Sequence, residues 1–155
     1  LMEQAESADV KELLSYREDS AGGIMTTDYV VVPETWTATQ IMDHLRAVAH
    51  DADVIYYVFV VTDLVSETLT GVVTLRDLIL AAPDAPAADF MEREIVTLQL
   101  DDDEEEAARL IAKYNLLAAP VVDQDGGLKG IVTVDDAIDI ILPTAWKKRL
   151  PRLFV

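Results

Sequence analysis

Residues 71–79 read GVVTLRDLI, and residues 130–138, 59 positions further along the chain, read GIVTVDDAI. Each copy has a glycine in an apolar run, a threonine three residues later, and an aspartate three residues after the threonine. An apolar run that ends on a capping residue predicts a strand that leads directly into a helix. A phrase that occurs twice in one chain also indicates an internal repeat.

The sequence around the two copies supports this repeat. Residues 54–61 and 119–122 are short apolar runs rich in β-branched or small side chains, and they predict buried strands. Apolar residues recur at helical spacing over 41–48 and again over 107–114, and they predict one amphipathic helix in each half. DQDGG, at 123–127, is typical of a turn between two strands.

Each half therefore predicts the order β-α-β-β-α, so the fold class is α/β (α+β). A unit of about 60 residues buries little surface by itself, so the two should pack sheet to sheet as a pseudo-symmetric pair. The expected division is a connector over 1–22, one repeat over 23–82, a second repeat over 83–142, and a basic tail over 143–155.

The charge is large and unevenly distributed. The chain of 155 residues has a formal charge of −17, and its first 142 residues carry 29 acidic and eight basic side chains, a charge of −21. So acidic a body repels nucleic acid, which is excluded as a partner, and attracts cations. Acidity of this kind is also typical of a charge that only maintains solubility.

The recurring threonine and aspartate have two interpretations. Thr74 with Asp77, and Thr133 with Asp136, match a capping box at the start of a helix, with aspartate in the usual place of glutamate. The start of a helix beside a small residue also attracts phosphate, and a nearby carboxylate can accept hydrogen bonds from ribose hydroxyls. The two interpretations are compatible.

Tandem β-α-β-β-α repeats that end on this glycine-threonine-aspartate phrase resemble the CBS-domain pairs, or Bateman modules, and the resemblance covers about 23–142. It implies a cleft between the repeats that binds an adenosine nucleotide such as ATP. Arg76 offers a cation beside Asp77, whereas Asp135 places a second anion beside Asp136, so we expect one nucleotide per chain. The ordinary alternative for Arg76 is a solvated surface residue. The full set of expected nucleotide-binding residues is Tyr57, Thr74, Arg76, Asp77, Val96, Leu117, Ala118, Thr133, Asp136 and Asp139.

A narrower resemblance begins upstream. ELLSYREDSAGGIMTTDYVVV, at 12–32, is similar to the segment that joins the amino-terminal helical domain to the CBS pair in the MgtE family of magnesium channels. The resemblance implies a cytosolic regulatory module of a homodimeric channel, on the cytoplasmic side of the membrane and continuous with a transmembrane domain. It also implies that acidic faces bind Mg²⁺ when the ion is abundant, which agrees with the preference of Mg²⁺ for carboxylates.

The expected metal ligands lie in LDDDEEEAARL, at 100–110, where six consecutive acids are predicted to open a helix. The resemblance assigns Asp103 and Glu105 to Mg²⁺. Acids in a first helical turn also complement the helix dipole without binding any metal.

The chain departs from the MgtE pattern after the second repeat. The family has metal-binding acids in a connecting helix there, whereas this chain has LPTAWKKRLPRLFV, at 142–155, with four cations and no acid. Cations beside Trp146 are typical of the cytoplasmic edge of a membrane span, and a docked terminal helix is the alternative. The amino-terminal helical domain is expected to be missing from this piece.

Two function classes remain. The first is the regulatory module of a magnesium channel that senses Mg²⁺ and an adenine nucleotide; the second is a free-standing CBS pair that senses a nucleotide and regulates a soluble partner. An enzyme is not expected, because His44 and His50 have no neighbouring nucleophile or carboxylate at a spacing that forms a catalytic dyad. Met25 and Met91 occupy matching positions in the two repeats, and we expect both in the core.

Overall fold

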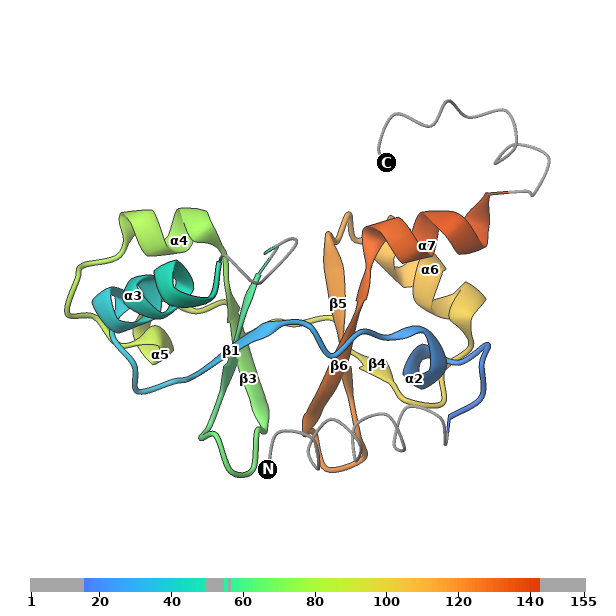
Figure 1. The fold of residues 1–155 in the computed structure, drawn as a ribbon, viewed down its shortest axis with the longest axis horizontal. Coiled ribbons are helices and arrows are strands. Elements are labelled where there is room, and N and C mark those ends of the chain that lie inside the picture. The colour runs from blue at the N-terminus through green and yellow to red at the C-terminus, as the bar shows by residue number, and fades with distance from the viewer. Residues whose placement is uncertain (1–15, 50–54, 56, 143–155) are drawn as a thin grey trace.

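The computed structural model describes residues 16–49, 55 and 57–142, and the predicted tail and the first 15 residues of the predicted connector lie outside this part. The described chain forms two units side by side, each with a small sheet and two helices over it (Figure 1). The elements are α2 (Ala21–Ile24), β1 (Val30–Pro33), α3 (Ala38–Val48), β2 (Val58–Val61), β3 (Leu69–Val73), α4 (Leu75–Leu80), α5 (Ala87–Phe90), β4 (Leu98–Gln99), α6 (Glu104–Lys113), β5 (Ala118–Val122), β6 (Leu128–Thr133) and α7 (Val134–Ile141).

The two sheets have the same topology. The first has the order β1-β2-β3 and the second the order β4-β5-β6, and in each the first pair is parallel and the second antiparallel. Both antiparallel pairs contain a register shift at the same place, between Val60 and Val61 in one and between Val121 and Val122 in the other. The predicted fold class and repeat are thus confirmed, although β2 begins at Val58 and is shorter than the apolar run that predicted it.

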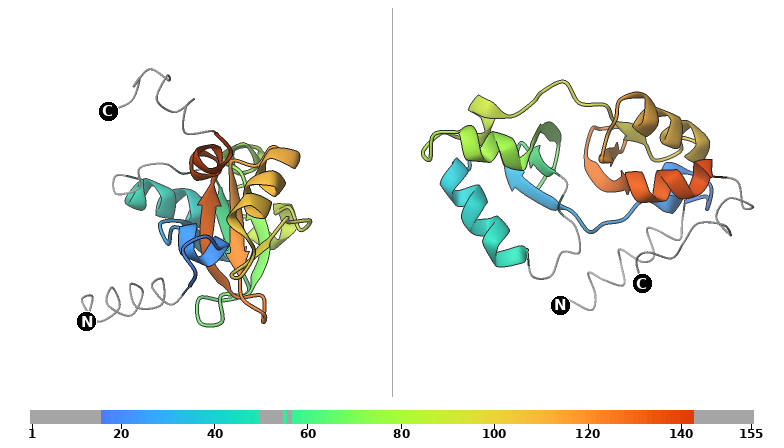
Figure 2. Two further views of the ribbon diagram at one scale, coloured as in Figure 1. Left: turned by 90° about the vertical axis from the view of Figure 1, so that its right-hand side faces the viewer. Right: turned by 90° about the horizontal axis from the view of Figure 1, so that it is seen from above.

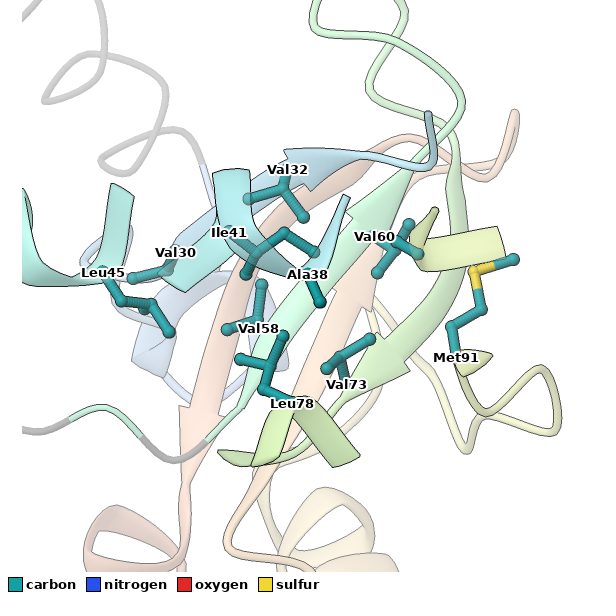
Figure 3. Packing of buried hydrophobic residues seen from close by; sticks show 11 residues of the cluster. Val30, Val32, Ala38, Ile41, Leu45, Val58, Val60, Val73, Leu78 and Met91 are labelled. Carbon is teal, nitrogen blue, oxygen red and sulfur yellow. The ribbon is translucent and has the colours of Figure 1, made fainter. Parts of the chain in front are cut away.

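The apolar residues of each repeat face a core between its sheet and its helices. In the first repeat, Ile41 and Leu45 of α3 pack onto Val58 and Val60 of β2, and all four are at least 95% buried (Figure 3). Helix α3 starts at a full capping box, in which Thr37 and Gln40 each bond the backbone of the other, so its apolar face is held in register with the strand.

The second helix of this kind is shorter than its sequence pattern predicted. Ala107 and Ile111 of α6 are buried as expected, but the helix ends at Lys113. Tyr114 is its C-cap and is exposed, because the next residue, Asn115, has a φ of 52° that ends the helix.

Short helices are exchanged between the repeats. Ala21 of α2, upstream of the first repeat, is buried in the second core, and its amide donates to the carbonyl of Asp102 (2.7 Å). Ala87 of α5 is buried in the first core in the same way, and its amide donates to the carbonyl of Trp36 (2.8 Å). The segments that cross between the units run on opposite sides of the molecule, which Figure 2 shows from above. The exchange ties the two repeats into one folded body.

The residue after each exchanged helix explains the glycine of the repeated phrase. Met91 covers Gly71 of β3, and Met25 covers Gly130 of β6, so that a Cβ on either glycine would overlap the methionine side chain. Both methionines are 8% exposed and belong to the cores, as the sequence predicted. The glycine is therefore required by close packing at these two points.

The two sheets meet at a third apolar cluster. Phe59 of β2 lies with Ala118, Leu128 and Ile131 of the second repeat, and Tyr29 packs edge-on against Phe59 at 6.2 Å between ring centroids. This contact confirms the predicted sheet-to-sheet packing. None of the helices formed by the described residues has the length and apolar character to cross a bilayer.

Candidate functional site: the cleft between the repeats

A cavity of about 280 Å³ opens at the junction of the two repeats. The first repeat contributes strand residues, the second contributes the end of α6 and the start of β5, and the crossing segment between them forms one wall. Its lining residues are Tyr57, Phe59, Val72, Glu92, Glu94, Ile95, Val96, Tyr114, Leu116, Ala118 and Pro120. Three residues predicted from the sequence, Tyr57, Val96 and Ala118, are thus brought together in one cavity.

A hydrogen bond joins the repeats at the rim of this cleft. The amide of Leu117 donates to the hydroxyl of Tyr57 at 3.1 Å, across 60 residues of sequence. Leu117 is about half exposed and is absent from the cavity lining, so its backbone makes the contact that its side chain does not. The bond fixes the ring of Tyr57 at the cavity wall.

Strand register places both motif threonines at this same end of the sheets. Val58 pairs with Val73, so Thr74 follows directly beside Tyr57, and Ala118 pairs with Thr133. Both helix starts, of α4 and of α7, therefore lie at the same edge of the two sheets (Figure 1), beside the cavity residues Tyr57 and Ala118. This arrangement is suited to a ligand that inserts an apolar end between the repeats and leaves a polar end at the helix starts.

The first motif forms a complete capping box. The Asp77 amide donates to Thr74 Oγ1 (3.1 Å), and the Thr74 amide donates to Asp77 Oδ2 (3.0 Å). The capping box thus uses one oxygen of this carboxylate, Oδ2, and does not use the other.

The second motif differs from the prediction. The Asp136 amide donates to Thr133 Oγ1 at 3.4 Å, but the return bond from the Thr133 amide to the aspartate is not formed. The two strands end at different places. Strand β6 includes Thr133, whereas β3 ends at Val73, so the Thr74 amide lies beyond the strand and can donate to the Asp77 carboxylate. The two motifs are therefore unequal in structure as well as in sequence.

The remaining predicted residues lie outside the lining of the cavity. Arg76 is exposed on the first turn of α4, and Asp139 is exposed on α7. The cavity lining also excludes Thr74, Asp77, Leu117, Thr133 and Asp136. Glu92 and Glu94, which no sequence pattern predicted, bring two carboxylates to the cavity. Glu92 is held there by backbone hydrogen bonds with Val72 in both directions (2.9 and 3.0 Å).

The acid run is arranged differently from its prediction. Only Glu104, Glu105 and Glu106 belong to the first turn of α6, while Asp103 is its N-cap and Asp102 accepts a bond from the Gln99 amide (2.8 Å). Six acids do not open the helix, because two of them complete the turn that precedes it.

The two expected metal ligands have protein partners. Asp103 Oδ1 caps the Glu105 amide at 3.5 Å, and Glu105 lies 3.9 Å from Arg109 in an exposed ion pair. Over residues 16–49, 55 and 57–142, no three acidic or histidine side chains converge on a point that could hold a metal ion.

Comparison with known proteins identifies the class of protein. The CBS domain family model matches residues 21–84 and again 87–143, so the chain belongs to this family and contains a pair of CBS domains. It is 45% identical over 141 residues to the magnesium transporter MgtE of Thermus thermophilus, and 41% identical over 144 residues to that of Bacillus subtilis. The alignments cover 91% and 93% of this chain but only 31% and 32% of those proteins, so the chain spans about a third of their length.

A solved structure gives the same result. The cytosolic domain of the Mg²⁺ channel MgtE in complex with ATP superimposes with a TM-score of 0.80 at 46% identity, and the match covers 86% of this chain and 53% of that one. The resemblance to MgtE that the sequence indicated is thereby confirmed.

Proposed function

We propose that this chain is the regulatory module of an MgtE-like magnesium channel, in which an adenine nucleotide binds the cleft between the repeats and Mg²⁺ binds acidic surfaces. The observation that carries the proposal is the cavity of Tyr57, Val96 and Ala118, which both repeats form together. A ligand in this place contacts both halves, so its binding free energy depends on their relative position.

The cleft offers the chemistry that an adenine nucleotide requires. Tyr57 and the apolar wall around Val96 suit the faces of a purine, and the capped start of α4 supplies Asp77 for ribose hydroxyls. Arg76, on the same first turn, supplies a cation for phosphate. Glu92 and Glu94 oppose a phosphate inside the cavity, so the phosphates must leave toward Arg76 or arrive with a bound Mg²⁺. ATP in the similar MgtE structure supports this choice of ligand.

Calorimetric titration of ATP into the wild type, Arg76→Ala and Arg46→Ala tests the nucleotide site. Arg46 is the control, because it is an exposed arginine on α3 whose ion pair with Asp43 (3.3 Å) lies away from the cavity lining. Loss of the Arg76 guanidinium should weaken ATP about tenfold or more, in keeping with one charge-assisted contact. Equal affinities of all three proteins for ATP would show that the nucleotide does not bind at this place.

Mg²⁺ sensing requires a second surface. The described residues contain no three-acid cluster, and Asp103 and Glu105 are too few to displace much of the water that Mg²⁺ holds. We place the ion between this acidic run and another acidic face, of a second copy or of another part of the same polypeptide. Repulsion between two such faces is relieved when the ion bridges them.

Thermal unfolding in MgCl₂, in CaCl₂ and in NaCl of the same ionic strength tests this part. The variant Asp103→Asn/Glu105→Gln removes two charges and keeps the cap, because asparagine caps a helix as well as aspartate does. The midpoint of the wild type should rise with the logarithm of the Mg²⁺ concentration beyond the NaCl control, and the variant should lose most of that rise. Identical unfolding curves of the wild type in MgCl₂ and in NaCl would show that the acids form only a solvated surface.

A homodimer on the cytoplasmic side of the membrane completes the proposal. Ile79 and Leu80 of α4 are 77% and 73% exposed, and Ile138 of α7 is 46% exposed. Both helices face the same side of the molecule (Figure 1), so these side chains offer an apolar surface to a second copy. Light scattering of Ile79→Glu against the exposed control Val65→Glu, in the hairpin between β2 and β3, should show a monomer only for the first.

A further inference from the structure

A groove of about 360 Å³ lies between α6 and α7 of the second repeat. Its walls are Glu105, Arg109 and Ala112 of α6 and Ile140 and Ile141 of α7. The three α6 residues are spaced at i, i+4 and i+7, so they form one stripe along the whole helix. Ile141 is 53% exposed, so the groove presents an apolar wall beside an acidic helix start.

We propose that residues 143–155 of the same chain cover this groove, with Trp146 against its apolar wall and the cations of the tail beside the acids at the start of α6. The proposal gives the basic tail a partner within the chain, and it places the cations of the tail at the same acidic helix start that the proposed Mg²⁺ site uses.

The tail begins at the groove. Helix α7 ends at Ile141, which lines the groove, and Leu142 is its C-cap. From Leu142 to Lys147 the chain spans at most about 17 Å. Helix α6, with ten residues, is about 15 Å long, so a tail that starts here reaches every part of its exposed stripe.

Charge favours the same partner. Residues 143–155 contain Lys147, Lys148, Arg149 and Arg152 and no acid. Residues 101–106 contain six acids, whereas α6 itself carries only two cations, Arg109 and Lys113. Each exposed ion pair contributes little, so the burial of the Trp146 ring must supply most of the stabilisation.

The first repeat supplies a precedent. The equivalent groove between α3 and α4 is lined by Ala81 and Pro83, which follow α4 directly, and Thr39 Oγ1 donates to the carbonyl of Pro83 (2.8 Å). The chain that leaves the last helix of that repeat thus turns back over its own groove. In the second repeat, the amide of Glu104 at the start of α6 already donates to the carbonyl of Asp19 (2.8 Å). The tail therefore does not take this backbone contact and lies over the groove instead.

Tryptophan fluorescence of the 155-residue chain tests the proposal, because its two tryptophans are Trp36 and Trp146. Trp36→Phe leaves Trp146 as the only reporter, and acrylamide quenching should be about twofold weaker than in the free peptide 143–155, as expected for a half-buried ring. Adding Ala112→Arg should restore peptide-like quenching, since the new side chain fills the groove and repels the tail. Ala47→Arg, an equally exposed alanine of α3, is the matched control and should leave quenching unchanged. The protection should also weaken as NaCl rises.

Several outcomes would overturn the proposal. Trp146 quenched equally in the chain, in the Ala112→Arg variant and in the peptide would show a tail without a partner. Protection that depends on protein concentration would assign the groove to a second copy, and protection that requires anionic lipid vesicles would assign the tail to a membrane surface. If Trp36→Phe does not fold, the wild type labelled with 5-fluorotryptophan gives the same readout by ¹⁹F NMR, with Trp146→Phe to assign the two signals.

Discussion

The amide of Leu117 and the hydroxyl of Tyr57 form a hydrogen bond of 3.1 Å that links the second repeat to the first at the rim of the cleft. Tyr57 also packs edge-on against Phe59, at 6.2 Å between ring centroids, within the cluster that joins the sheets. The same side chain therefore helps to hold the repeats together and forms a wall of the proposed nucleotide site.

Tyr57→Phe should separate these two roles. The ring remains, so the purine face is kept, but the cross-repeat bond is lost, at a cost of about 1 kcal/mol in the free energy of unfolding. Urea denaturation measures this change. Tyr114→Phe, which alters the other tyrosine of the cavity without breaking a bond between repeats, should change stability by much less. A Tyr57 variant as stable as the wild type would show that the bond contributes nothing.

The unequal capping boxes predict unequal effects of the two aspartates. Asp77→Ala removes the carboxylate that accepts from the Thr74 amide, and it should destabilise the chain by about 1 kcal/mol. Asp136→Ala removes no such bond and should cost clearly less. Thermal unfolding of the two variants gives the comparison, and equal losses would mean that the second motif caps its helix in solution as the first does.

Local patterns predicted the parts of the fold that depend on local physics. The strand-to-helix boundaries at Thr74 and Thr133 followed from capping chemistry, and the buried faces of α3 and α6 followed from spacing. The exchange of α2 and α5 was not predictable in this way. It depends on contacts such as that of Met25 with Gly130, which are more than 100 residues apart and have no signature in either segment alone.

The same distinction applies to the site. Tyr57, Val96 and Ala118 were predicted from the family resemblance, and they line one cavity. Glu92 and Glu94 were missed, because the crossing segment that carries them contains neither a motif nor a periodic pattern. Their position follows only from the backbone pairing of Glu92 with Val72 across the repeat boundary.

The turn between β2 and β3 predicts a pH effect confined to one carboxylate. Hydrogen bonds from the amides of Ser66 (2.7 Å) and Val65 (2.9 Å) lower the pKa of Asp63 below its ordinary value of 3.8. A carboxyl group whose pKa falls on folding stabilises the native state above its unfolded pKa, and this contribution is lost as the pH falls through the native pKa. The Ser66 amide signal should therefore titrate with a midpoint below 3.8 in NMR spectra. In Asp63→Asn the signal should not move, and a wild-type midpoint at or above 3.8 would contradict the assignment.

The contact of Met91 with Gly71 predicts a specific pattern of coupling. Gly71→Ala forces a Cβ into the methionine side chain and should destabilise the chain by about 1–3 kcal/mol. Met91→Ala removes the obstacle, so the double variant should be more stable than the sum of the two single losses predicts. The control replaces the methionine of the other repeat in place of Met91. Gly71→Ala combined with Met25→Ala should give additive losses, because Met25 covers Gly130 and lies in the other core. Urea denaturation of the five variants completes the cycle, and additivity in both pairs would show that the glycine of the repeated phrase is required for a reason other than this methionine.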